Sequence, residues 1–406
     1  MPADTPFGPG NPQPYLDPSG LDARTLAVRG GQSRSTFDET AEGMFLTSGF
    51  VYGSAEEAEA AFAGGLSKFV YSRYGNPTVA MFEERLRVLE GAQACYATAS
   101  GMGAVFTALA ALVGAGDRLV ASRGLFGSCF VIVDEILPRW GVETVFVDGP
   151  DLEQWREALS VPTTAVFFET PSNPMQELVD IAAVSGLAHA AGAQVVVDNV
   201  FGTPVFSRPL EHGADIVVYS ATKHIDGQGR VLGGAVLGPE DYIAGPVENL
   251  VRHTGPSLSP FNAWVLLKGL ETMDLRVRAM ADSALTVARF LEDHPRVVST
   301  VYPWLPSHPQ HELAQAQMSG GGTVVTFAID GGKAEAFAVM NALRLVDISN
   351  NLGDSKSLIT HPATTTHRRL GEGARATIGI TDGTVRISVG LESATDLIDD
   401  LRSGLG

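Results

Sequence analysis

Cysteines and ligand-spaced histidines are scarce in this sequence. Only Cys95 and Cys129 occur among 406 residues, and neither belongs to a CxxC pair or stands beside a histidine cluster. His361, His367, His308 and His311 are the histidines to consider as metal ligands, but Pro309 breaks the helix that the last two would need. We therefore expect no metal site, and the small number of cysteines fits a reducing cytoplasm best.

Basic residues are in the minority. The chain has 28 Lys and Arg against 46 Asp and Glu, which gives a formal net charge of −18. Such a charge repels phosphate backbones and acidic membrane surfaces, so we expect no nucleic-acid or membrane partner. A small anionic substrate would need a local basic pocket.

Long apolar runs are also absent. The most apolar stretch, residues 103–116, is too short to cross a bilayer and ends at Asp117 and Arg118. The first 20 residues hold six prolines but neither the basic nor the apolar region of a signal peptide, so they predict a flexible start. We expect a soluble protein.

The sequence is rich in short apolar runs that alternate with helical ones. The predicted strands cover residues 94–97, 118–121, 143–147, 164–169, 194–198, 216–220 and 234–237. This alternation predicts an α/β fold with a mostly parallel sheet covered by helices. After Pro260 comes a long helical stretch to about Asp293, then strands near 323–328 and 385–389 and a last helix, which together predict a smaller α+β domain. We expect an N-terminal arm (1–74), an α/β domain (75–273) and a C-terminal domain (274–406).

Polar residues follow two neighbouring predicted strands. Asp198 ends the apolar strand at 195–197, where a buried carboxylate needs a cationic partner, and the protonated nitrogen of a pyridine ring is one such partner. Lys223 follows the next strand, where a partly buried amine loses its proton more easily and can form an imine. Ser220 and Thr222 beside it can hydrogen-bond a phosphate. An Asp that caps a turn and a surface lysine are the ordinary alternatives, so the combination carries the prediction.

A turn of small residues follows the strand at 94–97. Ser100, Gly101, Met102 and Gly103 place backbone N–H groups at a helix start, which is a common site for a phosphate. A dinucleotide fingerprint is not expected, because Phe106 stands where the third glycine is required.

Five motifs in order along the chain resemble the Cys/Met-metabolism family of pyridoxal-phosphate enzymes, which have fold type I. They are Tyr71-Ser72-Arg73-Tyr74-Gly75-Asn76-Pro77-Thr78, Ser100-Gly101-Met102, Glu169-Thr170-Pro171-Ser172-Asn173-Pro174, Val197-Asp198-Asn199 and Ser220-Ala221-Thr222-Lys223-His224. The resemblance implies pyridoxal 5′-phosphate bound as a Schiff base on Lys223. It implies these cofactor-binding residues: Tyr71, Arg73, Gly101, Met102, Phe126, Asp198, Ser220, Thr222 and Lys223.

The resemblance also implies a shared site and a substrate clamp. Tyr71 and Arg73 would reach the cofactor phosphate of a neighbouring subunit, so the protein would be at least a dimer and, like related enzymes, a homotetramer. Arg386 would bind the substrate α-carboxylate, with Asn173 and Asn351 nearby. A charged residue in an apolar strand asks for an anionic partner in any case, although a structural ion pair is the alternative.

The motifs at 223–230 and 348–354 are similar to those of enzymes that act on O-succinylhomoserine. The expected reaction is γ-replacement, in which succinate leaves, sulfide adds and homocysteine forms in methionine biosynthesis. Phe126 stands where the family usually has a ring-stacking tyrosine, so the phenol proton is missing. A carboxylate leaving group, whose acid has a pKa near ~4, needs that proton less than a thiolate near ~8.5.

Several alternatives stay open from the sequence. A cystathionine γ-synthase would use cysteine as nucleophile, an O-acetylhomoserine enzyme would differ in the leaving group, and a methionine γ-lyase is disfavoured by Phe126 and by Ser128, where those enzymes tend to carry cysteine. Arg230 and Lys356 are candidates to bind the succinyl carboxylate. A non-catalytic protein on the same fold would be expected to lack Lys223, Asp198 or Arg386.

Overall fold

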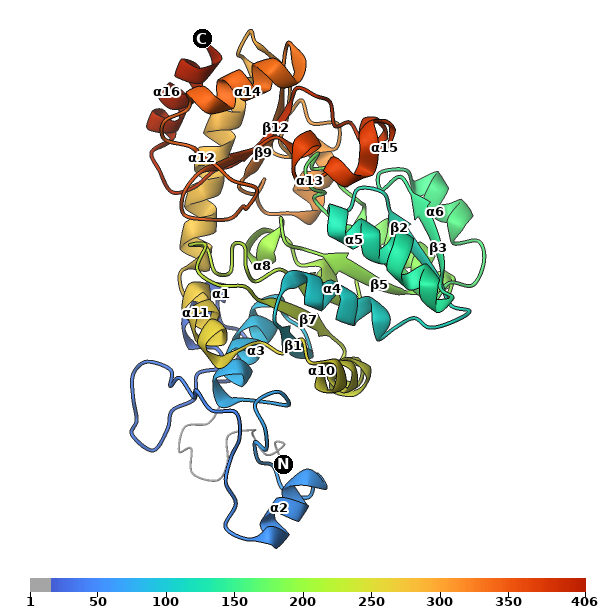
Figure 1. The fold of residues 1–406 in the computed structure, drawn as a ribbon, viewed down its shortest axis with the longest axis vertical. Helices are drawn as coiled ribbons and strands as arrows, with labels where there is room; N and C mark the ends of the chain where they lie inside the picture. Colours follow the sequence, from blue (N-terminus) through green and yellow to red (C-terminus); the bar gives the residue numbers. More distant parts are fainter. Residues whose placement is uncertain (1–15) are drawn as a thin grey trace. The chain divides into compact units, whose positions relative to one another are not determined.

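The computed structural model describes residues 16–406, so most of the predicted flexible start lies outside the described residues. The chain divides into two compact units (Figure 1). Unit 1 contains residues up to 111, 219–226 and 230–272, and unit 2 contains 112–218, 227–229 and 273–406. The predicted domain boundaries at 74/75 and 273/274 divide the chain into consecutive segments, whereas each compact unit combines segments that are separate in the sequence. These boundaries stay a prediction.

Unit 1 is mainly helical, with one pair of antiparallel strands. The strands β1 (Ala94–Thr98) and β7 (Gly234–Gly238) pair so that Tyr96 lies opposite Val236. The α-helices are α1 (Ala23–Arg29), α2 (Ala55–Phe62), α3 (Pro77–Glu90), α4 (Gly101–Ala110), α9 (Glu240–Tyr242), α10 (Glu248–Thr254) and α11 (Pro260–Leu270), and a π-helical segment, Ile243–Val247, joins α9 to α10.

Helix α3 begins where the sequence predicts. The Asn76 side chain accepts a hydrogen bond from the Thr78 N–H at 2.9 Å, and Pro77 occupies the first turn, where its missing N–H costs nothing. Phe82, Leu86 and other apolar residues of one face are wholly buried. The helix ends at Gly91, whose φ of 80° is the left-handed conformation that glycine adopts without strain.

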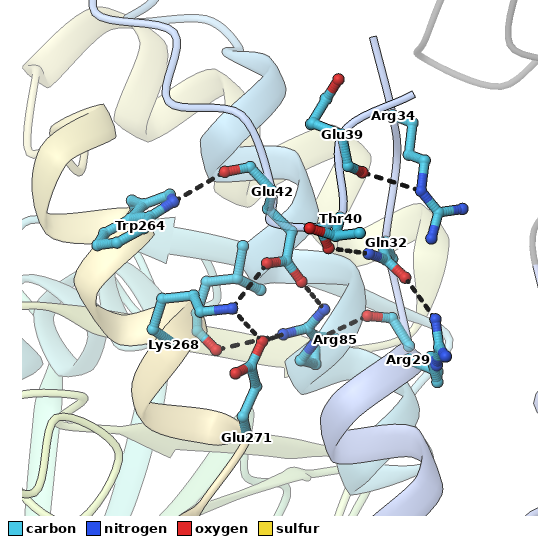
Figure 2. A network of polar contacts seen from close by, with 12 residues as sticks. Arg29, Gln32, Arg34, Glu39, Thr40, Glu42, Arg85, Trp264, Lys268 and Glu271 are labelled. Carbon is cyan, nitrogen blue, oxygen red and sulfur yellow. Dashed lines mark hydrogen bonds and ion pairs between the residues drawn. The ribbon is translucent and has the colours of Figure 1, made fainter. Parts of the chain in front are cut away.

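A buried ion network attaches residues 30–45 to helices α3 and α11. Figure 2 shows the Glu42 carboxylate between the side chains of Arg85 and Lys268, with both of which it forms ion pairs. The Arg85 side chain is fully buried, and its Nε donates to the Gly30 carbonyl oxygen at 2.7 Å. The Trp264 indole N–H donates to the Glu42 carbonyl at 2.9 Å. Side-chain charges from two helices therefore hold an irregular segment of the chain in place.

Unit 2 contains a parallel sheet whose strand order is β6-β5-β4-β2-β3. The strands are β2 (Arg118–Ser122), β3 (Glu143–Val147), β4 (Ala165–Glu169), β5 (Gln194–Asp198) and β6 (Ile216–Tyr219). Every residue of β4 is buried, as expected for a central parallel strand with both faces covered. The mostly parallel α/β sheet that the alternating pattern predicts is confirmed.

Helices and short helical segments follow the strands of this parallel sheet. They are α5 (Gly127–Val131), a π-helical segment (Ile132–Ile136), a 3₁₀ segment (Leu137–Trp140), α6 (Leu152–Ala158), α7 (Ile181–Ala190), α8 (Thr203–Phe206) and a 3₁₀ segment (Pro209–His212). Trp155 of α6 and Val184 of α7 pack with Val166 and Phe168 of β4 in one buried core. Burial of large side chains of this kind is worth about 1.5–3 kcal/mol each.

The C-terminal part of unit 2 is a smaller α+β arrangement, as predicted. Its five strands have the order β10-β11-β12-β9-β8. They are β8 (Val297–Val301), β9 (Val324–Ile329), β10 (Asp347–Ile348), β11 (Leu358–Thr360) and β12 (Thr384–Ser388). The helices are α12 (Met273–Glu292), α13 (His311–Gln317), α14 (Gly332–Ala342), α15 (Gly371–Thr377) and α16 (Ala394–Leu405), with 3₁₀ turns at Pro362–Thr364 and Arg368–Leu370. Residues of α12, α14 and α16 form one core with β9 and β12 (Figure 1).

The long helical stretch predicted after Pro260 is two helices rather than one. Helix α11 ends at Leu270 and α12 begins at Met273. The boundary between the two units falls between them: α11 packs against α3 in unit 1, whereas Val287 and Leu291 of α12 belong to the core of unit 2. Each helix follows its own core. Among residues 16–406, no helix is both long and apolar enough to cross a membrane.

Candidate active site

The helix start predicted to bind a phosphate is formed in unit 1. The Ser100 hydroxyl accepts a hydrogen bond from the Gly103 N–H at 3.1 Å and caps α4. A Cβ on Gly101 would lie 2.5 Å from the Ser220 Cβ, so only glycine allows the α4 turn to approach Ser220 this closely. The structure thus brings Gly101 and Ser220 together at a helix N-terminus, where backbone donors favour an anion.

Thr222 and Lys223 lie on the turn after β6. The Thr222 hydroxyl donates to the Gly233 carbonyl at 3.2 Å and accepts from the Gly233 N–H at 3.1 Å. The hydroxyl proton of Thr222 is therefore already donated to the backbone. Thr222 differs in this respect from Ser220 as a candidate hydrogen-bond donor to a phosphate. Lys223 is half-buried, and its backbone N–H donates to the Ser220 carbonyl at 3.2 Å, which closes the turn. Arg230 is held by Asp226 through an ion pair of 2.9 Å.

Tyr71 and Arg73 lie in a cluster of aromatic rings and cations, also in unit 1. The Arg73 guanidinium lies 4.8 Å from the centre of the Tyr74 ring, and Arg252 lies over the same ring at 4.0 Å. Arg73 also donates to the Arg252 carbonyl, and the Tyr71 ring meets the Tyr74 ring edge-on. Tyr71 is 40% exposed, so this cluster is at the surface of the unit.

Two carboxyl groups lie side by side at the ends of β4 and β5 in unit 2. Glu169 and Asp198 are register partners on these parallel strands, and both are buried. Burial raises the pKa of Asp198 to about 7, although the Val200 N–H, which donates to it at 3.1 Å, acts in the opposite direction. Burial, and after it the charge of Asp198, raises the pKa of Glu169 well above its usual range.

Phe126 is tied to the same carboxyl pair. Its backbone N–H donates to a Glu169 oxygen at 2.9 Å, and its ring is half-buried at the start of α5. Nearby Cys129 is buried, and burial is the main reason that its thiol pKa lies well above the usual range. A protonated thiol of this kind is a poor nucleophile.

Arg386 and Asn173 meet in the interior of unit 2. Arg386 Nη1 donates to Asn173 Oδ1 at 2.9 Å, and Nη2 donates to the backbone carbonyls of Asn350 at 2.9 Å and Asn351 at 3.2 Å. The Nε atom of Arg386 is buried without an acceptor. Within residues 16–406 no carboxylate forms an ion pair with Arg386, so the structural ion pair considered from the sequence is not formed there. A buried guanidinium with an unused donor suits a carboxylate ligand.

The structure adds His367 and Glu169, two residues to which sequence reasoning assigned no role. His367 Nε2 contacts the Asn173 carbonyl at 3.0 Å, and its Nδ1 contacts the Thr366 hydroxyl at 2.8 Å. Burial, and then the Arg386 charge, lowers the pKa of His367 to about 4, so it supports the Asn173–Arg386 pair as a neutral ring. The rule that polar residues end strands could have found Glu169 but gives no signal for His367. Within the described part of the chain, no group of three potential metal ligands gathers.

The described residues include the groups that pyridoxal phosphate requires. Unit 1 has the capped helix start beside Ser220 and the amine of Lys223, and unit 2 has a buried carboxylate that forms no ion pair within residues 16–406. The first suits a phosphate, the second an aldehyde and the third a protonated ring nitrogen. These residues fit the cofactor.

Comparison with known proteins gives a consistent result. The sequence model of the family described as Cys/Met metabolism PLP-dependent enzymes matches residues 24–406. An O-succinylhomoserine sulfhydrylase of Mycobacterium tuberculosis is 67% identical over 97% of this chain and 98% of that protein. One from Pseudomonas aeruginosa is 49% identical over 94% of both chains.

A solved structure from Campylobacter jejuni has a TM-score of 0.91 at 31% identity, covering 95% of this chain and 100% of that one. It is described as a putative O-acetylhomoserine (thiol)-lyase with N′-pyridoxyl-lysine-5′-monophosphate.

Proposed function

Because the chain belongs to the Cys/Met-metabolism family of pyridoxal-phosphate-dependent enzymes, we propose that it replaces the succinyl group of O-succinylhomoserine with sulfide, giving homocysteine and succinate for methionine biosynthesis. The observation that carries this proposal is the 67% identity, over almost the whole of both chains, to a protein named for that reaction. Pyridoxal 5′-phosphate is the cofactor of the family, and as an electron sink it makes loss of a group from Cγ feasible.

For the cofactor we propose contacts at both ends. Lys223 would carry it covalently, Asp198 would pair with its ring nitrogen, and Phe126 would stack on the ring. The phosphate would bind the backbone donors of Gly101 and Met102 and the hydroxyl of Ser220, with Thr222 holding the turn through Gly233. The helix start and the close approach of Gly101 to Ser220 support the phosphate position.

For the substrate we propose that Arg386 binds the α-carboxylate, with the free Nε–H as one donor. Asn173 would fix the guanidinium from one side, while the main chain at Asn350 and Asn351 would fix it from the other. Orientation of the amino acid through its carboxylate lets the Lys223 amine take the Cα proton and return protons to neighbouring carbons.

Phe126 supports an acylated homoserine as substrate. Its ring cannot donate a proton, and a departing succinate carboxylate, with an acid pKa near ~4, needs none. A departing thiolate, near ~8.5, needs more help, which disfavours methionine as substrate. Lys356, 63% exposed on its side chain and only loosely paired with Asp354, stays a candidate for the succinyl carboxylate.

We propose that neighbouring subunits share their active sites. Tyr71 and Arg73 would bind the cofactor phosphate of a neighbouring subunit in a homotetramer built of such dimers. Exposed apolar side chains in the same segment, Val51 at 89% and Phe62 at 63%, support contact with a second copy. We place the enzyme in the cytoplasm as a soluble protein, since neither Cys95 nor Cys129 forms a disulfide.

A product assay tests the reaction. Purified holoenzyme is incubated with O-succinyl- or O-acetylhomoserine and with sulfide or cysteine, and the sulfur product is identified. We expect homocysteine from the succinyl donor and sulfide. Faster formation of cystathionine would instead indicate a cystathionine γ-synthase, and preference for the acetyl donor would contradict the named substrate.

The variant Lys223→Ala tests the role of the Lys223 amine in the same assay. Without the amine we expect γ-replacement to fall by at least about 1,000-fold, because both covalent attachment and proton transfer are lost. Turnover at the wild-type rate would refute the role of Lys223.

A further inference from the structure

Glu169 lies near Asp198, Phe126 and Arg386, three of the unit 2 residues assigned to the site. It is the last residue of β4 and faces Asp198, its register partner on β5. It accepts the backbone N–H of Phe126 at 2.9 Å, and Arg386 is close enough to influence its titration. At 4% exposure it cannot act on bulk solvent or on a distant ligand. Its role must lie in what it does to these neighbours.

Two buried carboxyl groups this close cannot both be charged without a compensating cation. Neither Glu169 nor Asp198 forms an ion pair within the described residues, and the proposed cofactor supplies one ring-nitrogen cation, which pairs with Asp198. The Arg386 guanidinium favours an ionised Glu169, but burial and the charge of Asp198 outweigh it. The remaining carboxyl group is therefore best accommodated as the acid.

Protonation does not remove the contact with Phe126. A protonated carboxyl group keeps a carbonyl oxygen that accepts a hydrogen bond, so it can hold the Phe126 N–H in either state. An ionised Glu169 would add a second negative charge near the place where the substrate carboxylate must bind. The neutral form holds Phe126 without that repulsion.

We propose that Glu169 is a positioning residue that stays protonated in the working enzyme, fixing the Phe126 backbone while Asp198 alone carries the negative charge for the cofactor nitrogen. This inference rests on the proposed pairing of Asp198 with the cofactor. It assigns to Glu169 a neutral hydrogen-bonding role rather than an ionic one.

Two variants separate these roles. Glu169→Ala removes the acceptor for Phe126, and we expect the dissociation constant for pyridoxal phosphate, measured by absorbance titration of apoenzyme, to rise roughly fivefold to tenfold. Glu169→Gln keeps the shape and the carbonyl acceptor but cannot ionise, and we expect it to restore affinity to within about threefold of wild type. If Glu169→Gln is as weak as Glu169→Ala, the neutral role is wrong.

Infrared difference spectroscopy gives a direct second readout. In the holoenzyme at pH 7, the wild-type minus Glu169→Gln spectrum should contain the carbonyl stretch of a protonated carboxyl group. If only carboxylate bands differ, the inference is overturned.

Asp198→Ala distinguishes failure of the premise. We expect it to weaken cofactor binding and change the cofactor absorption spectrum. An unchanged affinity and spectrum would overturn the assignment of Asp198 and with it the inference. If Asp198→Ala changes the affinity and the spectrum but Glu169→Gln binds the cofactor as weakly as Glu169→Ala, the inference about Glu169 is wrong and the role of Asp198 stands.

Discussion

Arg386 illustrates how a single side chain depends on its surroundings. It is almost wholly buried, and its hydrogen bonds go to neutral oxygens of Asn173, Asn350 and Asn351. Burial lowers the pKa of Arg386 to about 10, so the guanidinium is still charged at neutral pH. A buried charge that forms no ion pair within residues 16–406 is costly unless a ligand supplies the anion.

Arg386→Leu tests this at the residue scale. Because the charge-assisted hydrogen bonds from the guanidinium to the substrate carboxylate are lost, we expect kcat/KM for the acylated homoserine to fall at least about 100-fold. The affinity for pyridoxal phosphate should stay within about threefold of the wild-type value. Arg402→Leu, at a side chain 57% exposed in the same unit, is the control and should have little effect. Wild-type kcat/KM in Arg386→Leu would rule out the carboxylate clamp.

At the scale of elements, the ends of strands and helices place the chemistry. The ends of β4 and β5 bring Glu169 beside Asp198, and the start of α4 brings Gly101 against Ser220. Residues 30–45 have no regular structure of their own, and Glu42 attaches them to α3 and α11 (Figure 2).

Glu42→Gln tests the attachment. It leaves the Arg85 charge buried without its main partner, so we expect the free energy of unfolding to fall by about 3 kcal/mol. Glu153→Gln, at a side chain 81% exposed in a surface ion pair, should change it by less than about 0.5 kcal/mol. Equal effects of the two changes in denaturant titrations would show that the buried network contributes nothing special.

The same residue predicts an acid dependence. Burial alone would raise the pKa of Glu42, but hydrogen bonds and charge from Arg85 outweigh it and hold the pKa below the usual value. A lowered folded-state pKa means that the stabilisation is complete above the unfolded value near ~4.3 and is lost as pH falls through the folded value. Unfolding curves between about pH 5 and pH 3 should therefore depend less steeply on pH in Glu42→Gln than in wild type.

At the scale of the whole molecule, the proposed sites need two chains. Lys223 and Arg73 of one chain would serve different sites, since Arg73 would reach the phosphate of the neighbouring subunit. Subunits with different defects should then complement each other.

Mixing Lys223→Ala with Arg73→Ala, after dissociation and reassembly, tests this arrangement. Half of the dimers would be mixed and each would hold one intact site, so we expect activity of about a quarter of wild type from two defective proteins. Each variant treated alone is the control. Activity no higher than the mean of the two would contradict the shared site.

The linear sequence determined the fold class, the cofactor and the strand-end residues, because apolar periodicity, helix caps and short motifs are local signals. Asn76 and Phe82 show this for α3, and the alternating runs show it for the parallel sheet. Only the tertiary structure decided that α11 and α12 follow separate cores, that Glu169 faces Asp198, and that His367 supports Asn173. These contacts join residues 29 and 194 positions apart (198 − 169 and 367 − 173). Packing in three dimensions sets them, and no local pattern along the chain encodes them.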